Sequence, residues 1–88
     1  MLTVNVGDMV KRNDIINKLV DMTYERSDMD FHRGTFRVRG DIIDIVPVNE
    51  KSSGIRIELF GDEVDRISTF DPLTGTVLQN KKTIRKYL

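Results

Sequence analysis

Two short segments with the same rhythm constrain the fold of this chain more than any other feature. The first is RVRGDIIDI, from Arg37 to Ile45, and the second is ELFGDEVDRI, from Glu58 to Ile67. In both, a Gly-Asp pair separates two stretches in which apolar residues recur as they do in strands. Glycine at the first position of a two-residue turn accepts the positive φ that a type II′ hairpin turn requires. We therefore predict two antiparallel β-hairpins.

A turn at Gly40-Asp41 fixes which residues face each other in the first hairpin. The expected pairs are Phe36–Ile45, Val38–Ile43 and Arg37–Asp44. The first two pairs are apolar, so one face of the hairpin is suited to a core. Successive side chains of a strand point to opposite faces, so Arg37 and Arg39 project from the other face. Pro47 cannot donate to a sheet and ends the return strand.

The second hairpin has the same design with one irregularity. We expect it to run from Ile55 to Phe60, turn at Gly61-Asp62 and return from Val64 to Phe70. On the return strand Val64 and Ile67 are three residues apart, which breaks strict alternation, and we predict a β-bulge or a longer turn there rather than a helix.

One amphipathic helix is predicted before the hairpins, between Asp14 and Tyr24. Its apolar residues recur at spacings of one, three and four, as on the buried stripe of a helix, and they are Ile15, Ile16, Leu19, Val20 and Met22. Asn13 is the expected N-cap, and Asp14 lies favourably near the positive end of the helix dipole.

These elements add up to an α+β fold, with one N-terminal amphipathic helix packed on a small antiparallel sheet of about four to five strands. Residues 76–78 can supply the last short strand, after a turn at residues 71–75. The end of the chain, residues 79–88, is expected to be a frayed basic tail. With 88 residues the chain is expected to be one domain, residues 1–88, and a monomer.

The charge balance and the lack of cysteine narrow the class of protein. Lys plus Arg number 14 and Asp plus Glu number 14, so the net charge is zero, whereas a stand-alone nucleic-acid binder usually carries a basic excess. There is no cysteine for a disulfide or a thiolate metal site, which suits a reducing cytoplasm. No apolar run is long enough to span a membrane. We expect a cytoplasmic protein without membrane contact.

Few residues could suggest an active site. His32 stands alone in a polar loop, where a solvated side chain is a more common role than a catalytic base. Asp28 and Asp30 could hold Mg²⁺ or exchange protons, but their spacing is more typical of a capping turn. Neither of the common phosphate-binding glycine motifs occurs. We therefore expect no catalytic residue, no metal and no cofactor.

The most informative polar feature is a group of arginines around one predicted strand: Arg26, Arg33, Arg37 and Arg39. A guanidinium group offers a planar fork of donors that binds carboxylates, so a partner with an acidic patch would fit. A simpler interpretation is that Arg37 pairs with Asp44 across the hairpin and Arg39 is only solvated. An exposed pair of that kind contributes about 0.2–1 kcal/mol. The residues alone leave both interpretations open.

The run YERSDMDFHRGTFRVRGD, from Tyr24 to Asp41, resembles the segment typical of the UvrA-interaction domain of UvrB. Further similar pieces are VGD at 6–8, KLVDMTYER at 18–26, GIRIELFGDEVDRI at 54–67 and FDPLTG at 70–75. The resemblance thus covers nearly the whole chain up to Gly75. The same module occurs in the transcription–repair coupling factor Mfd.

The resemblance implies a non-catalytic module that docks UvrA in bacterial nucleotide excision repair, largely through electrostatic contacts. By position, the implied contact residues are Arg26 in YER, Arg37 and Arg39 in FRVRGD, and Arg56 and Glu58 in IRIELF. The motor motifs of UvrB have no counterpart here, so ATP hydrolysis is not implied. Direct DNA binding by this domain is not expected either.

Two alternatives remain beside the docking hypothesis. One is a nucleic-acid contact module, which would use the same arginines together with the basic residues between 81 and 86. The other is a structural insert that sets the geometry of the UvrB motor domains.

Overall fold

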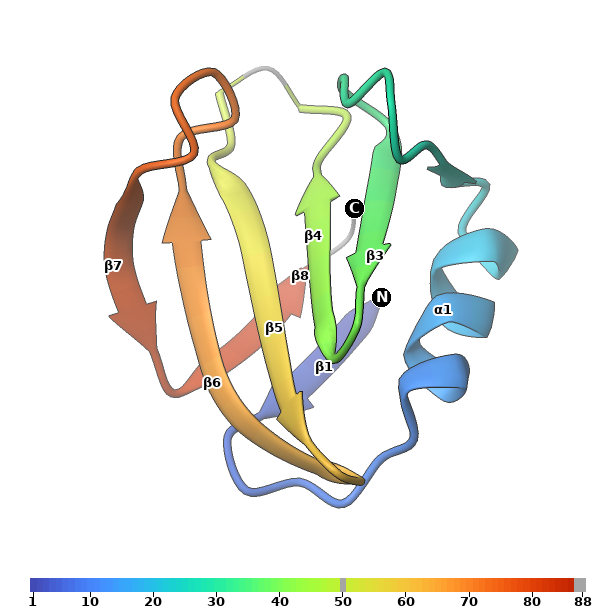
Figure 1. Ribbon diagram of the computed structural model, residues 1–88, viewed down its shortest axis with the longest axis vertical. Coiled ribbons are helices and arrows are strands. Elements are labelled where there is room, and N and C mark those ends of the chain that lie inside the picture. The colour runs from blue at the N-terminus through green and yellow to red at the C-terminus, as the bar shows by residue number, and fades with distance from the viewer. Residues whose placement is uncertain (50, 87–88) are drawn as a thin grey trace.

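The computed structural model describes residues 1–49 and 51–86, which form one helix and eight strands (Figure 1). The helix is α1 (Arg12–Asp21). The strands are β1 (Leu2–Asn5), β2 (Glu25–Arg26), β3 (Thr35–Arg39), β4 (Ile42–Val46), β5 (Gly54–Phe60), β6 (Glu63–Phe70), β7 (Val77–Lys81) and β8 (Thr83–Lys86). The fold is α+β, as predicted, with more strands than the four to five expected.

The strands make two sheets of unequal size. Six strands form the main sheet in the order β2-β3-β4-β5-β6-β7, and β1 pairs with β8 in a separate two-stranded ribbon. Every neighbouring pair is antiparallel except the short parallel pair β2–β3. Consecutive strands of the main sheet are also neighbours in space, because short connections join them.

Both predicted hairpins and the bulge are present. β3 and β4 pair in the expected register, which joins Phe36 to Ile45, Val38 to Ile43 and Arg37 to Asp44. Gly40 and Gly61 have φ angles of 58° and 62°, and the aspartate after each has no positive φ, as a type II′ turn requires. Between Glu58 and Leu59 the β5–β6 register shifts, so that Asp65 is left without a partner in β5. That extra residue is the predicted bulge.

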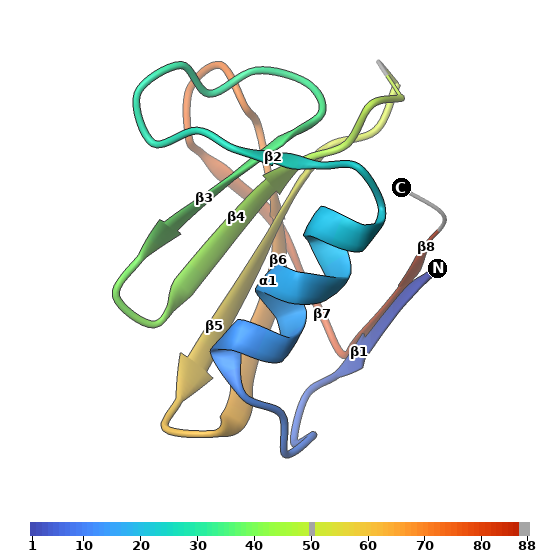
Figure 2. The ribbon, with the colours of Figure 1, turned by 90° about the vertical axis from the view of Figure 1, so that its right-hand side faces the viewer.

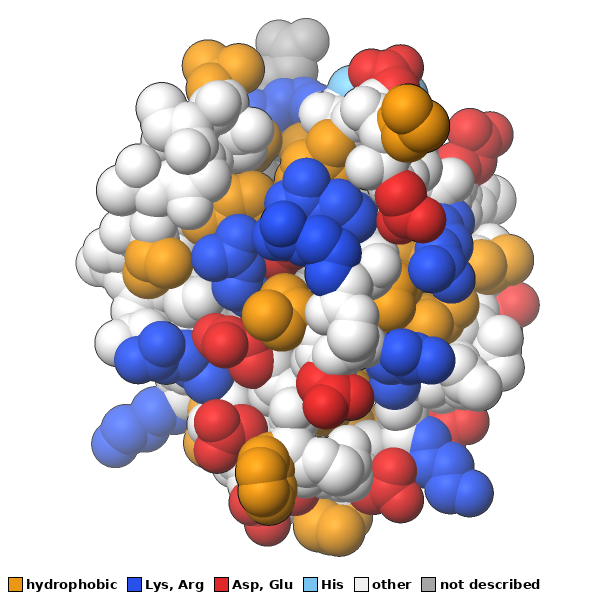
Figure 3. Space-filling view, in the orientation of Figure 1, with side chains coloured by type: hydrophobic (Ala, Val, Ile, Leu, Met, Phe, Trp, Pro, Cys, Tyr) orange, Lys and Arg blue, Asp and Glu red, His pale blue; other side chains and the backbone are white. Residues whose placement is uncertain are grey.

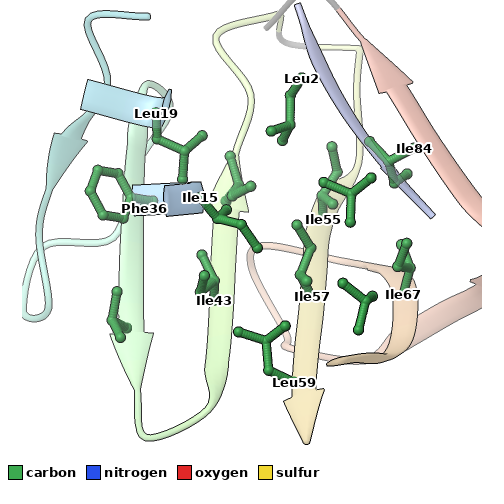
Figure 4. Packing of buried hydrophobic residues seen from close by; sticks show 14 of the residues in the cluster. Leu2, Ile15, Leu19, Phe36, Ile43, Ile55, Ile57, Leu59, Ile67 and Ile84 are labelled. Carbon is green, nitrogen blue, oxygen red and sulfur yellow. The ribbon is translucent and has the colours of Figure 1, made fainter. Parts of the chain in front are cut away.

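The core lies between the inner face of the main sheet, the helix α1 and the β1–β8 ribbon. Figure 2 shows α1 and the ribbon on the same side of the main sheet. Ile15 and Leu19, four residues apart on α1, are 3% and 0% exposed, so one helix stripe packs on the sheet. The ribbon contributes Leu2, Val4 and Ile84 to the same core. Figure 4 shows side chains from all three parts meeting there.

The helix differs from the prediction in its first residue and in one residue of its buried apolar stripe. It begins at Arg12, and Lys11 occupies the N-cap position without a side-chain hydrogen bond, so the assignment of Asn13 as N-cap is wrong. Val20 is 54% exposed and lies outside the buried stripe. Asp14 does lie in the first turn, near the positive end of the helix dipole.

The prediction of a frayed tail at residues 79–88 is wrong for residues 79–86. Residues 79–81 belong to β7 at the edge of the main sheet, and residues 83–86 form β8. Ile84 is 4% exposed because β8 pairs with β1 and turns this side chain into the core. Residues 87–88 lie outside the described part of the chain.

Candidate functional site

A buried carboxylate on the outer face of the main sheet binds three arginines. The side chain of Asp44 is 1% exposed and accepts hydrogen bonds from Arg37, Arg39 and Arg56. We call these three arginines the arginine cluster. The Nε of Arg56 lies 2.7 Å from Oδ1 of Asp44. The Nη2 atoms of Arg37 and Arg39 lie 2.9 and 3.2 Å from Oδ2.

Strand register explains why these four residues meet. Arg37 faces Asp44 across β3–β4, and Asp44 faces Arg56 across β4–β5. Cross-strand neighbours project from the same face of a sheet, and Arg39 follows Arg37 at a spacing of two. This face is opposite to the one covered by α1 and the ribbon. Figure 3 shows it with Lys and Arg side chains gathered near the middle of the sheet.

Two aromatic rings lie beneath the arginine cluster. The rings of Phe31 and Phe70 are stacked, with centroids 6.1 Å apart and an interplanar angle of 7°. The guanidinium carbon of Arg37 lies 4.3 Å from the centroid of Phe31, and that of Arg56 lies 4.8 Å from the centroid of Phe70. Such cation–π attraction holds both guanidinium groups over these rings.

A glycine makes room for one of these rings. A Cβ atom at Gly54 would lie only 2.5 Å from Cζ of Phe70, closer than side-chain carbons approach one another. Gly54 is the residue opposite Phe70 in the β5–β6 register, so the ring lies across the backbone of the neighbouring strand. The absence of a side chain at Gly54 therefore lets Phe70 reach the position from which it supports Arg56.

The electrostatics of the cluster favour a permanent positive charge. Burial by itself would raise the pKa of the Asp44 carboxyl, but hydrogen bonds from Arg56 and Arg37, together with their charges, lower it below the ordinary value of 3.8. The hydrogen bond to Asp44 in turn raises the pKa of Arg56. Three guanidinium groups around one carboxylate leave an excess of two positive charges within the cluster, beside the negative charge of Glu58.

The three arginines differ in how much of each side chain reaches solvent. The side chain of Arg39 is 57% exposed, whereas those of Arg37 and Arg56 are 22% and 16% exposed. Arg39 is thus the member that an approaching molecule meets first. Arg37 pairs with Asp44 as the register predicts, and its neighbours already hold its position.

Of the other residues singled out in the sequence, Glu58 lies on the same strand as Arg56, and Arg26 lies on the edge strand β2. Glu58 and Phe60 follow Arg56 at spacings of two along β5, on the same outer face. Phe60 is 78% exposed, and sequence reasoning assigned it no role. Arg26 lies on the edge strand β2, where its Nε is 3.5 Å from Asp28. It is not one of the arginines that bind Asp44.

The loop before β3 is held by its own polar residues. The Oδ1 of Asp28 accepts a hydrogen bond at 3.4 Å from the backbone N–H of Val38, and Nδ1 of His32 lies 2.9 Å from the carbonyl oxygen of Asp30. Among the described residues, no group of three or more His, Cys, Asp or Glu side chains could hold a metal ion. Within the same residues, no helix is long and apolar enough to cross a membrane.

Comparisons with known proteins match almost the entire chain. Residues 2–87 match the family model described as "UvrB interaction domain". UvrABC system protein B from Dechloromonas aromatica is 58% identical over 78 residues, which are 89% of this chain and 11% of that protein. The protein of the same name from Neisseria meningitidis is 52% identical over 79 residues, 90% of this chain and 12% of the relative. That from Clostridium beijerinckii is 49% identical over 83 residues, 94% of this chain and 13% of the relative.

Proposed function

Because this chain belongs to the UvrB interaction domain family, we propose that residues 1–88 are one non-catalytic domain that docks UvrA in bacterial nucleotide excision repair. The chain spans only 11–13% of the curated relatives that it matches, all named UvrABC system protein B. That name and the family description support a role in the UvrABC repair system. We also propose that the protein acts in the cytoplasm. The choice of UvrA as the partner is what the family resemblance implies, and the arginines of the outer sheet face fit an acidic partner.

The arginine cluster is the observation that carries the proposal. The excess of two positive charges within the cluster lies on an outer sheet face, on guanidinium groups that Asp44 binds and, for Arg37 and Arg56, that aromatic rings support. Arginines held in this way lose little side-chain freedom when they bind carboxylates. The surface therefore suits an acidic protein partner, with charge attraction raising the association rate.

The residues around the cluster extend the proposed docking surface. Glu58 would orient basic groups of the partner, and Phe60 offers an exposed aromatic side chain of the kind common at interfaces. Arg26 adds a half-exposed positive charge on the neighbouring edge strand. We place all three at the margin of the surface, with Arg39 as its most accessible charged residue.

A binding titration with purified UvrA tests the proposal. The wild-type chain should bind UvrA at low salt and more weakly at high salt, because solvated charge pairs are screened. Arg39→Glu should weaken binding by about tenfold or more. Arg85→Glu is a matched control, since Arg85 is an exposed arginine on β8, away from the arginine cluster. Arg85→Glu should bind UvrA as tightly as wild type does. The proposal is wrong if Arg39→Glu also binds as tightly as wild type.

A further inference from the structure

An apolar hollow lies directly beside the arginine cluster. It has a volume of about 360 Å³. Its apolar walls come from Phe31, Val46, Pro72 and Leu73, and the charged residues Arg33 and Asp71 also line it. Val46 is the last residue of β4, two residues after Asp44 and on the same outer face. The hollow therefore occupies the end of the strand whose middle carries the cluster, between the loop before β3 and the loop that joins β6 to β7.

The hollow and the cluster share a wall. One ring, that of Phe31, lines the hollow, lies under the guanidinium group of Arg37 and stacks on Phe70. Along β4, the spacing of two residues between Asp44 and Val46 corresponds to about 7 Å. A single segment of a partner could therefore reach both features.

The two loops that border the hollow are held by hydrogen bonds. In the β6–β7 loop, Oδ1 of Asp71 accepts a hydrogen bond from the Leu73 N–H at 2.9 Å, and the Asp71 carbonyl accepts one from the Gly75 N–H at 2.7 Å. On the other side, Nη1 of Arg33 donates to the carbonyl oxygens of Pro47, Asn49 and Ser52 at 2.8–3.1 Å. The walls are thus built before any partner arrives, which lowers the cost of binding.

Leu73 is the residue that most needs an explanation. Its side chain is 95% exposed, although the turn that carries it is hydrogen-bonded and ordered. A single exposed leucine is ordinary on a protein surface. An exposed leucine that borders an apolar hollow, next to an excess of positive charge, has the composition of an interface core with a charged rim.

We propose that this hollow receives an apolar side chain of the docking partner, from a segment that also carries the acidic residues bound by the arginine cluster. The proposal rests on the proposed function, whose partner is UvrA. The excess of two positive charges in the arginine cluster attracts acidic side chains of the partner segment. The distance between the cluster and the hollow sets how far these acidic side chains lie from the apolar one. In an extended segment the two kinds of residue would be about two positions apart, and in a helix three or four.

Removal of the exposed leucine tests the proposal without disturbing the fold. Leu73→Ser should weaken binding of purified UvrA by about tenfold, since burial of a leucine side chain stabilises a complex. The loss should be similar at low and high salt, whereas the loss caused by Arg39→Glu should shrink at high salt. Leu73→Met, which keeps an apolar side chain, should bind nearly as wild type does.

The control is Val20→Ser, which removes an exposed apolar side chain from α1, on the far side of the sheet from the hollow. It should not change affinity. If Leu73→Ser binds as wild type does while Arg39→Glu does not, the hollow is not part of the interface and the docking function stands. If neither variant changes affinity, the docking surface itself is wrongly assigned.

Discussion

The Nη2 atom of Arg37 lies 2.9 Å from Oδ2 of Asp44, across the turn of the first hairpin. This pair is not an exposed ion pair of small effect, because the Asp44 side chain is 1% exposed and also binds Arg39 and Arg56. A buried carboxylate without its partners would be strongly destabilising, and so would the three arginines without their carboxylate. Asp44 therefore stabilises the domain and sets the positions of the residues that we propose to bind UvrA.

Asp44→Asn should lower the free energy of unfolding by about 3 kcal/mol, because it leaves three neighbouring cations without their shared anion. Urea unfolding followed by circular dichroism measures this change. The control is Asp41→Asn, which alters an exposed aspartate in the turn of the same hairpin and should have little effect. Equal unfolding midpoints for the two variants would show that Asp44 is not the hub of the network.

The contribution of Asp44 should depend on pH in one direction. Its pKa is lower in the folded state than the ordinary value of 3.8, so folding favours the charged carboxylate. The stabilisation is then complete above about pH 4–5, where the unfolded carboxyl is also ionised, and is lost as pH falls through the lower folded pKa. The difference in stability between wild type and Asp44→Asn should stay constant from neutral pH to about pH 5 and shrink below about pH 4. A difference that grows in acid would contradict the assignment.

Charge reversal at Arg37 and at Arg39 should have different effects on stability. Arg39→Glu removes one hydrogen bond to Asp44, but the Arg39 side chain is 57% exposed, so binding to UvrA should weaken by about tenfold or more while the unfolding temperature falls less than in Arg37→Glu. Arg37→Glu places a second carboxylate next to Asp44 and removes the contact with Phe31, so it should also lower stability by about 2 kcal/mol. From the sequence alone, either reversal would be expected to leave the fold intact. Thermal unfolding of the two variants side by side distinguishes the two expectations.

Gly54→Ala should destabilise the domain by about 2 kcal/mol, because the new methyl group would overlap the ring of Phe70. Phe70→Leu removes the ring and should remove most of that clash. In the double variant, Gly54→Ala should therefore cost much less than it does in the wild-type background. If the two substitutions are simply additive in urea unfolding, the close approach of Phe70 to Gly54 has no energetic effect.

The domain alone should not bind DNA. The net charge of the chain is zero, and the carboxylate of Asp44 neutralises one of the three positive charges of the arginine cluster. A gel shift with damaged and undamaged duplexes at micromolar protein should show no complex. A salt-sensitive shift that Arg39→Glu abolishes would favour the alternative of a nucleic-acid contact module.

Local sequence patterns predicted both hairpins, the register of the first, and in the second an irregularity, a bulge or a longer turn, which is a bulge in the structure. Each depends on neighbours along the chain, namely alternation of side chains and a glycine at the turn. The β1–β8 ribbon could not be predicted in this way, because residues 2–5 and 83–86 are far apart in sequence. Without that pairing, the basic residues near the end of the chain are typical of a tail.

The candidate site was predictable to the same extent. The hairpin register predicted that Arg37 would face Asp44, and the family resemblance pointed to Arg39 and Arg56. That Arg56 would share the same carboxylate depends on β4 and β5 being neighbours, which no local pattern indicates. The aromatic support was missed for a similar reason, because Phe31 comes from a polar loop and reaches the sheet only in the folded chain.

The β1–β8 ribbon also has a consequence for how the chain folds as it is made. During synthesis, residues 2–5 leave the ribosome well before their partners at 83–86 do. The β3–β4 and β5–β6 hairpins need only nearby residues, so each can form as soon as its own residues have left the exit tunnel. We therefore expect closure of the ribbon over a nearly complete sheet to be the last step in the folding of this domain.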